Sequence, residues 1–160
     1  MKLSVEAILD VAQRIEQNAA VYYGKAAERF PEFADVMGQL QVMEVQHEQK
    51  FMKMQNNLEE EFRSKMPADP FGELESYIQA FADTSGGEGR PAEPAKWDGS
   101  ESVQDMLARS VELETESVKF YESIGKALVG ASGAEHLAEI IKEELDHVEI
   151  LKRLLATHAG

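Results

Sequence analysis

Two Glu and two His in this chain recur in one pattern, in which the Glu precedes the His by three residues. The pairs are Glu44 with His47 and Glu144 with His147, one hundred positions further on. Residues three apart on a helix lie about 60° apart around its axis, so each Glu shares a face with its His. A carboxylate and an imidazole on one inward face can ligate a transition-metal ion. The spacing therefore predicts metal chemistry on helices.

Two further Glu residues strengthen this interpretation. Glu16 and Glu114 each precede one of the Glu-x-x-His segments by about thirty residues, and each has a Tyr seven positions later, at Tyr23 and Tyr121. The second half of the chain thus repeats the first, which predicts a duplicated helical hairpin.

The four carboxylates also match in their distance from the predicted turns. Glu16 is fourteen residues before Phe30 and Glu44 is fourteen after it, while the other two Glu residues are each fifteen from Val129. Residues equally far from the turn of an antiparallel hairpin lie at one level, here about 21 Å from it at about 1.5 Å per residue. If the hairpins pack together, the carboxylates and imidazoles meet in the middle of one core.

Long helices must position these groups, and the pattern predicts an all-α fold. We expect an antiparallel four-helix bundle of two hairpins, joined by a long crossover that holds a short helix near residues 73–82. The predicted divisions are a single domain over 1–160, a hairpin over 4–64, a crossover over 65–99 and a hairpin over 100–157. All five Pro residues fall in the breaks between the long helices.

Local signals place the helix ends. Ser4 is a predicted N-cap for a first helix that ends near Arg29, and Ser102 with Asp105 predicts a capping box for the third. The second helix is expected from about Pro31 to Ser64, the third to about Val129, and the fourth over about 134–157. The predicted inward face of the second helix is Val36, Leu40, Met43, Glu44, His47, Phe51, Met54 and Leu58.

Single Glu residues can also be interpreted as solvent-exposed side chains without a role in metal binding. Glu16 taken alone could lie at the edge of its apolar stripe and reach water. We expect Glu112 and Glu116 to be solvated, because they point about 160° away from Glu114. Glu143 competes with its neighbour Glu144, which is preferred because its spacing repeats that of the first half.

The remaining histidines and the methionines have no such support. No Glu lies three residues before His136 or His158, and both are predicted to be surface residues. The Met residues of the apolar stripes are expected to fill the core.

Composition limits the function classes. The 160 residues are 43% hydrophobic and 29% charged with a formal net charge of -14, which argues against nucleic acid and anionic membranes as partners. The absence of Cys excludes thiolate zinc sites, iron–sulfur clusters and a Cys nucleophile. No signal peptide or bilayer-spanning run is apparent, so the expected compartment is the cytoplasm.

Four buried carboxylates would be destabilising without cations, and two divalent ions would neutralise them. One Glu from each of two helices plus a Glu-x-x-His from each of the other two is the arrangement of di-iron and di-manganese carboxylate bundles. Carboxylates with imidazole suit iron or manganese, whereas Mg²⁺ or Ca²⁺ alone would not need the His.

The chain resembles the rubrerythrin branch of the ferritin-like superfamily. The resemblance covers most of the chain, through Ile15-Glu16 to Tyr22-Tyr23, the run 26–32, Glu44-x-x-His47-Glu48, Leu113-Glu114 to Phe120-Tyr121-Glu122, and Glu144-Leu145-Asp146-His147. It implies a non-haem di-iron centre, loaded with two Fe ions or with Mn or Zn in their place. The implied activity is reduction of hydrogen peroxide or oxidation of Fe(II) by oxygen or peroxide.

The resemblance also implies roles for single residues. Glu16 and Glu114 resemble terminal ligands, and Glu44 and Glu144 resemble bridging carboxylates. His47 and His147 complete the ligand set. Tyr23 and Tyr121 resemble tyrosines that hydrogen-bond to ligand Glu residues. A homodimer is expected by the same resemblance, with exchange of helix pairs as one form of it.

Two departures from the family bear on function. Rubrerythrins proper carry a Cys-rich rubredoxin domain, and without Cys a peroxidase cycle needs an external electron donor. Many also have an extra Glu one turn after the third-helix ligand, where this chain has Ser117. Two alternatives therefore stay beside the redox enzyme: a metal-binding or iron-handling protein without turnover, and a purely structural bundle.

Overall fold

The computed structural model describes residues 4–63, 72, 74–76, 78–79 and 97–158. These residues form helices and connecting turns, without a strand among them, which confirms the all-α prediction for this part of the chain. The helices are α1 (Val5–Arg29), the 3-10 helix η1 (Pro31–Phe33), α2 (Ala34–Asn56), α3 (Glu60–Arg63), α5 (Val103–Ile124) and α6 (Glu135–His158).

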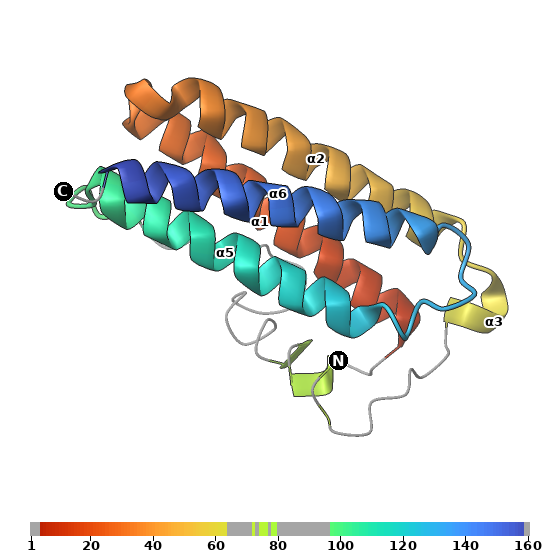
Figure 1. Cartoon of the computed structure of the whole chain (residues 1–160). Helices are drawn as coiled ribbons and strands as arrows, with labels where there is room; N and C mark the ends of the chain where they lie inside the picture. The colour runs from red at the N-terminus through yellow and green to blue at the C-terminus, as the bar shows by residue number, and fades with distance from the viewer. Residues whose placement is uncertain (1–3, 64–71, 73, 77, 80–96, 159–160) are drawn as a thin grey trace.

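Four long helices lie side by side as two antiparallel pairs, α1 with α2 and α5 with α6 (Figure 1). At one end of the molecule Arg29 of α1 donates a hydrogen bond to the carbonyl of Gly99, just before α5, at 2.5 Å. At the other end Arg63 of α3 pairs with Glu6 of α1 at 3.1 Å. The chain therefore leaves the first pair at one end and enters the second pair at the opposite end.

Most of the predicted crossover 65–99 lies outside the described residues. Of the short helix predicted over 73–82, the described residues 74–76 and 78–79 are helical. Leu74 and Ile78 are buried and pack in the same apolar cluster as Leu9 and Phe51.

The N-terminal ends of α1 and α5 have the predicted caps. The Ser4 hydroxyl accepts a hydrogen bond from the backbone N–H of Ala7 at 3.1 Å. At α5 the Ser102 hydroxyl accepts from the Asp105 N–H at 3.1 Å, and the Asp105 carboxylate accepts from the Ser102 N–H at 2.8 Å. These bonds satisfy N–H groups that have no partner inside a helix.

Two helices end earlier than predicted. The second long helix ends at Asn56 instead of Ser64, because consecutive Asn residues favour turns and Leu58 folds back onto the core. The third ends at Ile124 instead of Val129, where Gly125 begins a run of turns. Gly130 has a φ of 83°, a left-handed conformation that suits Gly.

The apolar core has two parts, one on each side of a polar layer. One part includes Ile8, Leu9, Phe51, Phe120, Ile124 and Ile140. The other includes Tyr22, Met37, Leu40, Met106, Leu107 and Leu151. Along each long helix the chain passes from one part to the other, and the polar layer falls at the change. The helices thus hold titratable side chains at mid-height, between two apolar parts of the interior.

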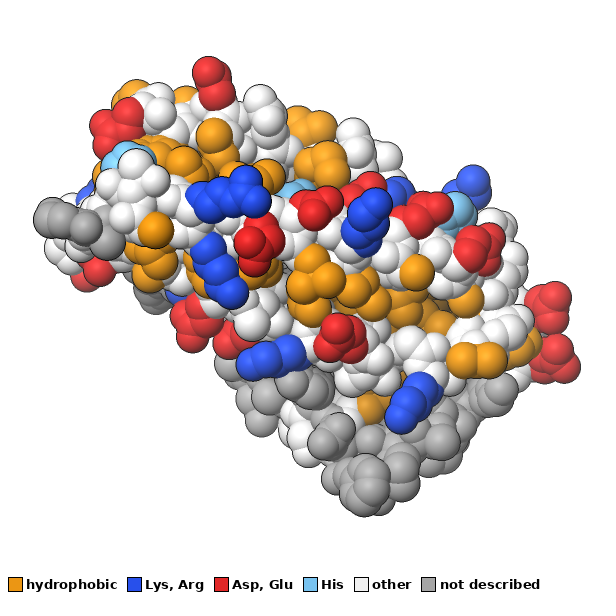
Figure 2. All heavy atoms as spheres, viewed as in Figure 1, with side chains coloured by type: hydrophobic (Ala, Val, Ile, Leu, Met, Phe, Trp, Pro, Cys, Tyr) orange, Lys and Arg blue, Asp and Glu red, His pale blue; other side chains and the backbone are white. Residues whose placement is uncertain are grey.

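On the face seen in Figure 2, acidic and basic side chains are interspersed with apolar ones. None of the helices in the described part of the chain combines the length and hydropathy needed to cross a bilayer.

Candidate metal centre

The polar layer consists of six buried side chains, one or two from each long helix. All are at most 5% exposed: Glu16 from α1, Glu44 and His47 from α2, Glu114 from α5, and Glu144 and His147 from α6. The structure thus brings together every residue that the sequence predicted as a metal ligand. The edge position considered for Glu16 is not the one it occupies, since that residue is 1% exposed.

The first group surrounds His47. Its Nδ1 lies 3.6 Å from Glu16 Oε2, 3.3 Å from Glu44 Oε2 and 2.8 Å from Glu144 Oε1. One potential ligand atom from each of these four residues lies within 4.8 Å of the others. Such a group is compact enough to hold one cation.

The second group surrounds His147. Its Nδ1 lies 3.4 Å from Glu44 Oε1, 3.7 Å from Glu114 Oε2 and 3.5 Å from Glu144 Oε2. These four residues meet the same 4.8 Å limit.

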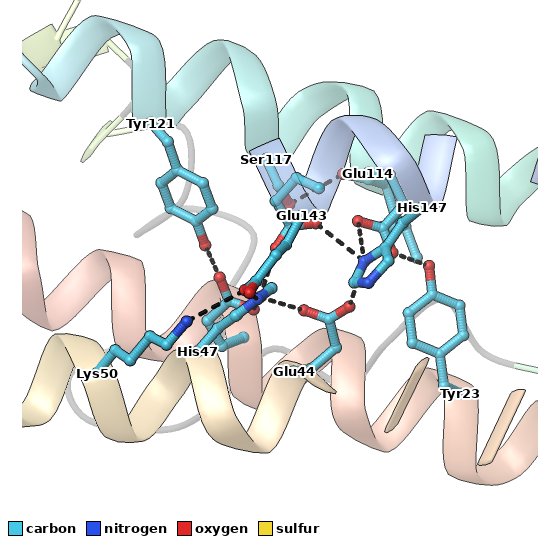
Figure 3. Close-up of polar contacts among 12 residues, drawn as sticks. Tyr23, Glu44, His47, Lys50, Glu114, Ser117, Tyr121, Glu143 and His147 are labelled. Atoms are coloured by element: carbon cyan, nitrogen blue, oxygen red, sulfur yellow. Dashed lines mark hydrogen bonds and ion pairs between the residues drawn. The ribbon is translucent and has the colours of Figure 1, made fainter. Parts of the chain in front are cut away.

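Glu44 and Glu144 belong to both groups. Each directs one carboxylate oxygen to His47 and the other to His147. The two imidazole rings face each other across them, with centroids 5.9 Å apart and planes inclined by 25° (Figure 3). The arrangement therefore offers two adjacent cation positions that share two carboxylates, with Glu16 at one and Glu114 at the other.

Several of these buried atoms lack a hydrogen-bond partner. They are Glu44 Oε1, both carboxylate oxygens of Glu144, and the Nδ1 atoms of His47 and His147. Leaving a buried polar group unpaired is costly, so a cluster of such atoms facing one point needs an explanation. Metal ions would supply it, because anionic oxygens and imidazole nitrogens are the donors that such ions take. The residues present therefore fit a metal site.

Two tyrosines hold the outer carboxylates from opposite hairpins. The Tyr23 hydroxyl of α1 donates a hydrogen bond to Glu114 of α5, and the Tyr121 hydroxyl of α5 donates one to Glu16 of α1 (Figure 3). Both tyrosines are fully buried. Burial, together with the neighbouring carboxylate, raises the pKa of each phenol, so both remain proton donors.

Burial also makes the two outer carboxylates, Glu16 and Glu114, hold protons in the absence of a cation. Burial and then the charge of Glu144 raise the pKa of Glu114 to about 8 and that of Glu16 well above its usual value. Burial disfavours charged imidazoles, but the surrounding Glu carboxylates outweigh it and raise the pKa of His47 and His147. The cluster thus attracts positive charge, as protons or as metal ions.

The contact between Glu143 and His47 was not predicted from the sequence. Glu143 Oε2 lies 2.7 Å from His47 Nε2, on the side of the ring away from the carboxylate cluster, and 3.2 Å from Lys50 Nζ. The contact joins α6 to α2, so no spacing within one helix could have predicted it. The Glu143-Glu144 pair in the sequence was the only signal, and there Glu144 was preferred as the ligand.

The other acidic residues and histidines lie where the sequence predicted. Glu112 and Glu116 are exposed on α5. His136 pairs with Glu139 at the surface, and the exposed His158 packs against Phe33. Ser117 is buried beside the site, but its hydroxyl donates to the Leu113 carbonyl of its own helix at 3.0 Å. Ser117 therefore adds no charge to the cluster.

Comparison of the chain with protein-family models, with curated proteins and with solved structures gave no match.

Proposed function

We propose that this protein is a ferritin-like, rubrerythrin-type redox protein that binds two iron ions in the centre of its helical bundle. Glu44 and Glu144 would bridge the two ions. Glu16 with His47 would complete one position, and Glu114 with His147 the other. The observation that carries the proposal is the sharing of Glu44 and Glu144 between the two groups.

The donor set favours iron or manganese over other cations. Four carboxylates and two imidazoles form a mixed oxygen and nitrogen set without thiolates. Mg²⁺ and Ca²⁺ prefer oxygen ligands alone, whereas structural zinc sites are usually closed four-coordinate sites, often with Cys. Zinc remains able to occupy the positions in place of iron.

A pair of iron ions, when bound, supplies two one-electron redox changes and thus the two electrons needed to reduce hydrogen peroxide or to begin the reduction of oxygen. The protein's own residues would hold the charge and exclude water. Tyr23 and Tyr121 fix the orientation of Glu114 and Glu16, and their phenols stay protonated next to the centre. Apolar side chains above and below the layer keep the carboxylates in a medium of low dielectric.

Electrons for repeated peroxide reduction would come from outside these 160 residues, because the sequence contains no Cys for a thiolate cluster or dithiol. Fe(II) itself is the alternative electron source, in which case the protein acts as a ferroxidase. Both activities use the same centre.

A second candidate is an iron-handling protein that binds metal without turnover. The observation that favours it is Ser117, which adds no carboxylate where a redox-linked shift of iron would use one. Such a protein would load and release Fe(II), and would not oxidise an excess of it.

Anaerobic loading with Fe(II), followed by oxygen in one sample and hydrogen peroxide in another, tests the proposal. We expect two Fe(II) per chain and an absorbance increase of Fe(III) after oxidant, with continued oxidation when Fe(II) is in excess. Binding of two Fe(II) without oxidation of the excess would favour the iron-handling alternative. A protein that binds no iron, manganese or zinc would contradict both and leave a structural bundle.

A further inference from the structure

His47 is contacted on both sides of its ring, by ligand carboxylates on one side and by a different carboxylate on the other. Its Nδ1 faces Glu44 and Glu144, while its Nε2 lies 2.7 Å from Glu143 Oε2. A neutral imidazole has one protonated and one bare nitrogen, and the hydrogen bond made by one nitrogen decides the state of the other. When the ring is neutral, the Glu143 carboxylate accepts a hydrogen bond from Nε2–H, which leaves Nδ1 unprotonated toward the candidate metal position.

Glu143 is in turn held by Lys50. The Lys50 ammonium donates to Glu143 Oε2 at 3.2 Å, one turn of α2 beyond His47 (Figure 3). The side chains of Glu143 and Lys50 are 36% and 30% exposed, so this pair lies at the surface end of the contact. The contacts from Lys50 to Glu143 and from Glu143 to His47 therefore connect the surface to the centre.

The repeat in the sequence shows that the corresponding positions of the other half cannot form such a series of contacts. Glu44 and His47 correspond to Glu144 and His147, one hundred positions apart. By the same offset Glu143 corresponds to Met43, and Lys50 corresponds to Ile150. A thioether and an alkyl chain cannot take the place of a carboxylate held by an ammonium group.

The geometry around the two histidines also favours His47 over His147. The shortest distance from Nδ1 to a ligand carboxylate is 2.8 Å at His47 and 3.4 Å at His147. His47 is fully buried, whereas His147 is 5% exposed. The His47 half is thus the tighter and better supported of the two.

We propose that the two cation positions are inequivalent, with the position at His47 binding a divalent metal more tightly because Glu143 holds the His47 ring. This inference rests on the proposed function, in which the centre holds two cations. Glu143 is a positioning residue that acts through His47. When metal is limiting, the protein binds one ion at the His47 position. The His147 position is occupied only at higher metal concentrations.

The expected effect of removing Glu143 follows from what such supporting carboxylates contribute. Loss of a partner that orients a ligating His typically weakens metal binding by about 10- to 100-fold. Glu143 contacts His47 and has no equivalent at His147, so the loss should fall on one position alone.

Anaerobic titration with Co(II), followed by its visible absorbance, tests this in variants that each keep one position. His147→Ala keeps the His47 position, and His47→Ala keeps the other. We expect tighter Co(II) binding by His147→Ala than by His47→Ala. Adding Glu143→Ala to the His147→Ala variant should weaken Co(II) binding by about 10-fold or more. Adding it to the His47→Ala variant should leave Co(II) binding unchanged. Glu143→Gln, which retains an acceptor for Nε2–H, should restore part of the loss.

Glu139→Ala is the matched control, since it removes an exposed carboxylate one turn earlier on α6. If a His variant fails to fold, Glu143→Ala in the otherwise unchanged protein serves, where it should weaken the first of two Co(II) binding steps and spare the second. Equal affinities in the two His variants, or equal weakening of both steps, would overturn the inference while two bound ions still support the proposed function. Absence of Co(II) binding in the unchanged protein would instead refute the proposed function.

Discussion

Tyr121 of α5 donates its phenolic hydrogen bond to Glu16 of α1, across the boundary between the two helical hairpins. Tyr23 of α1 makes the reciprocal bond to Glu114 of α5. Each hairpin thus supplies the group that orients the other hairpin's outer carboxylate. Neither hairpin alone contains a supported set of ligands, so the candidate centre depends on their packing.

Removing one of these hydroxyls should weaken metal binding without unfolding the protein. Tyr121→Phe keeps the buried ring but leaves Glu16 without its donor, and we expect an increase of about 10-fold in the dissociation constant for Co(II). Tyr22→Phe is the control, because the Tyr22 hydroxyl donates to the Met106 carbonyl at 3.0 Å and does not contact a ligand. Equal effects of the two variants would mean that Tyr121 acts only through packing.

The shared carboxylates should differ from the unshared ones in how many ions their loss affects. Glu44→Ala removes one carboxylate oxygen from each of the two groups. We therefore expect metal binding at both positions to weaken and the metal content to fall well below two ions per chain. Glu16→Ala removes a ligand from the His47 group only and should leave the His147 position occupied.

Elemental analysis of purified and metal-loaded variants measures this, with circular dichroism to show that helicity is retained. Two ions per chain in Glu44→Ala would contradict the assignment of Glu44 as a bridging residue.

The sequence predicted most of the fold and the six residues of the candidate centre because both depend on periodicity. Glu44 and His47 share an inward face whatever the neighbouring helices do, and the caps at Ser4 and Ser102 depend on residues within one turn. On α2 the helical pattern does not decide which of two adjacent apolar residues, Val36 or Met37, faces the interior. Met37 is fully buried there and Val36, the predicted core residue, is only partly so.

Features that depend on how the hairpins pack could not be predicted. The contact of Glu143 with His47 crosses from α6 to α2, and the pairing of each Tyr with the opposite hairpin's Glu depends on the same packing. The early end of the second helix follows from Leu58 joining the core, which outweighs the helical pattern beyond Asn57.

The capping box of α5 offers a test of local stability apart from the centre. Ser102→Ala removes the acceptor of the Asp105 N–H, and we expect a loss of about 1 kcal/mol in the free energy of unfolding. Urea denaturation of the metal-free protein measures it, to avoid the contribution of bound metal. Ser132→Ala, at an exposed turn position, should change stability by less than about 0.5 kcal/mol. If Ser102→Ala also changed the free energy of unfolding by less than about 0.5 kcal/mol, the capping box would not contribute to stability and packing alone would stabilise α5.

The protonated cluster predicts how the stability of the metal-free protein depends on pH. Burial raises the pKa of Glu114 from its usual 4.5 to about 8, so the folded chain keeps a proton that the unfolded chain releases. The stabilisation from that proton is complete below about pH 4.5 and is lost as pH rises toward 8. Glu16 shifts in the same direction. The raised pKa of each His adds a loss that begins above its usual value of 6.5.

The metal-free protein should therefore become less stable between pH 5 and 8. The lowered pKa values of Glu143 and Glu144 act with the opposite sign, but below their usual value of 4.5 and so outside this window. Bound metal replaces the protons, so its stabilising effect should grow as pH rises. Urea unfolding at several pH values, with a chelator or with Mn(II), measures both trends. Glu114→Gln should flatten the metal-free slope, whereas metal-free stability that rises over this range would show that the cluster does not hold these protons.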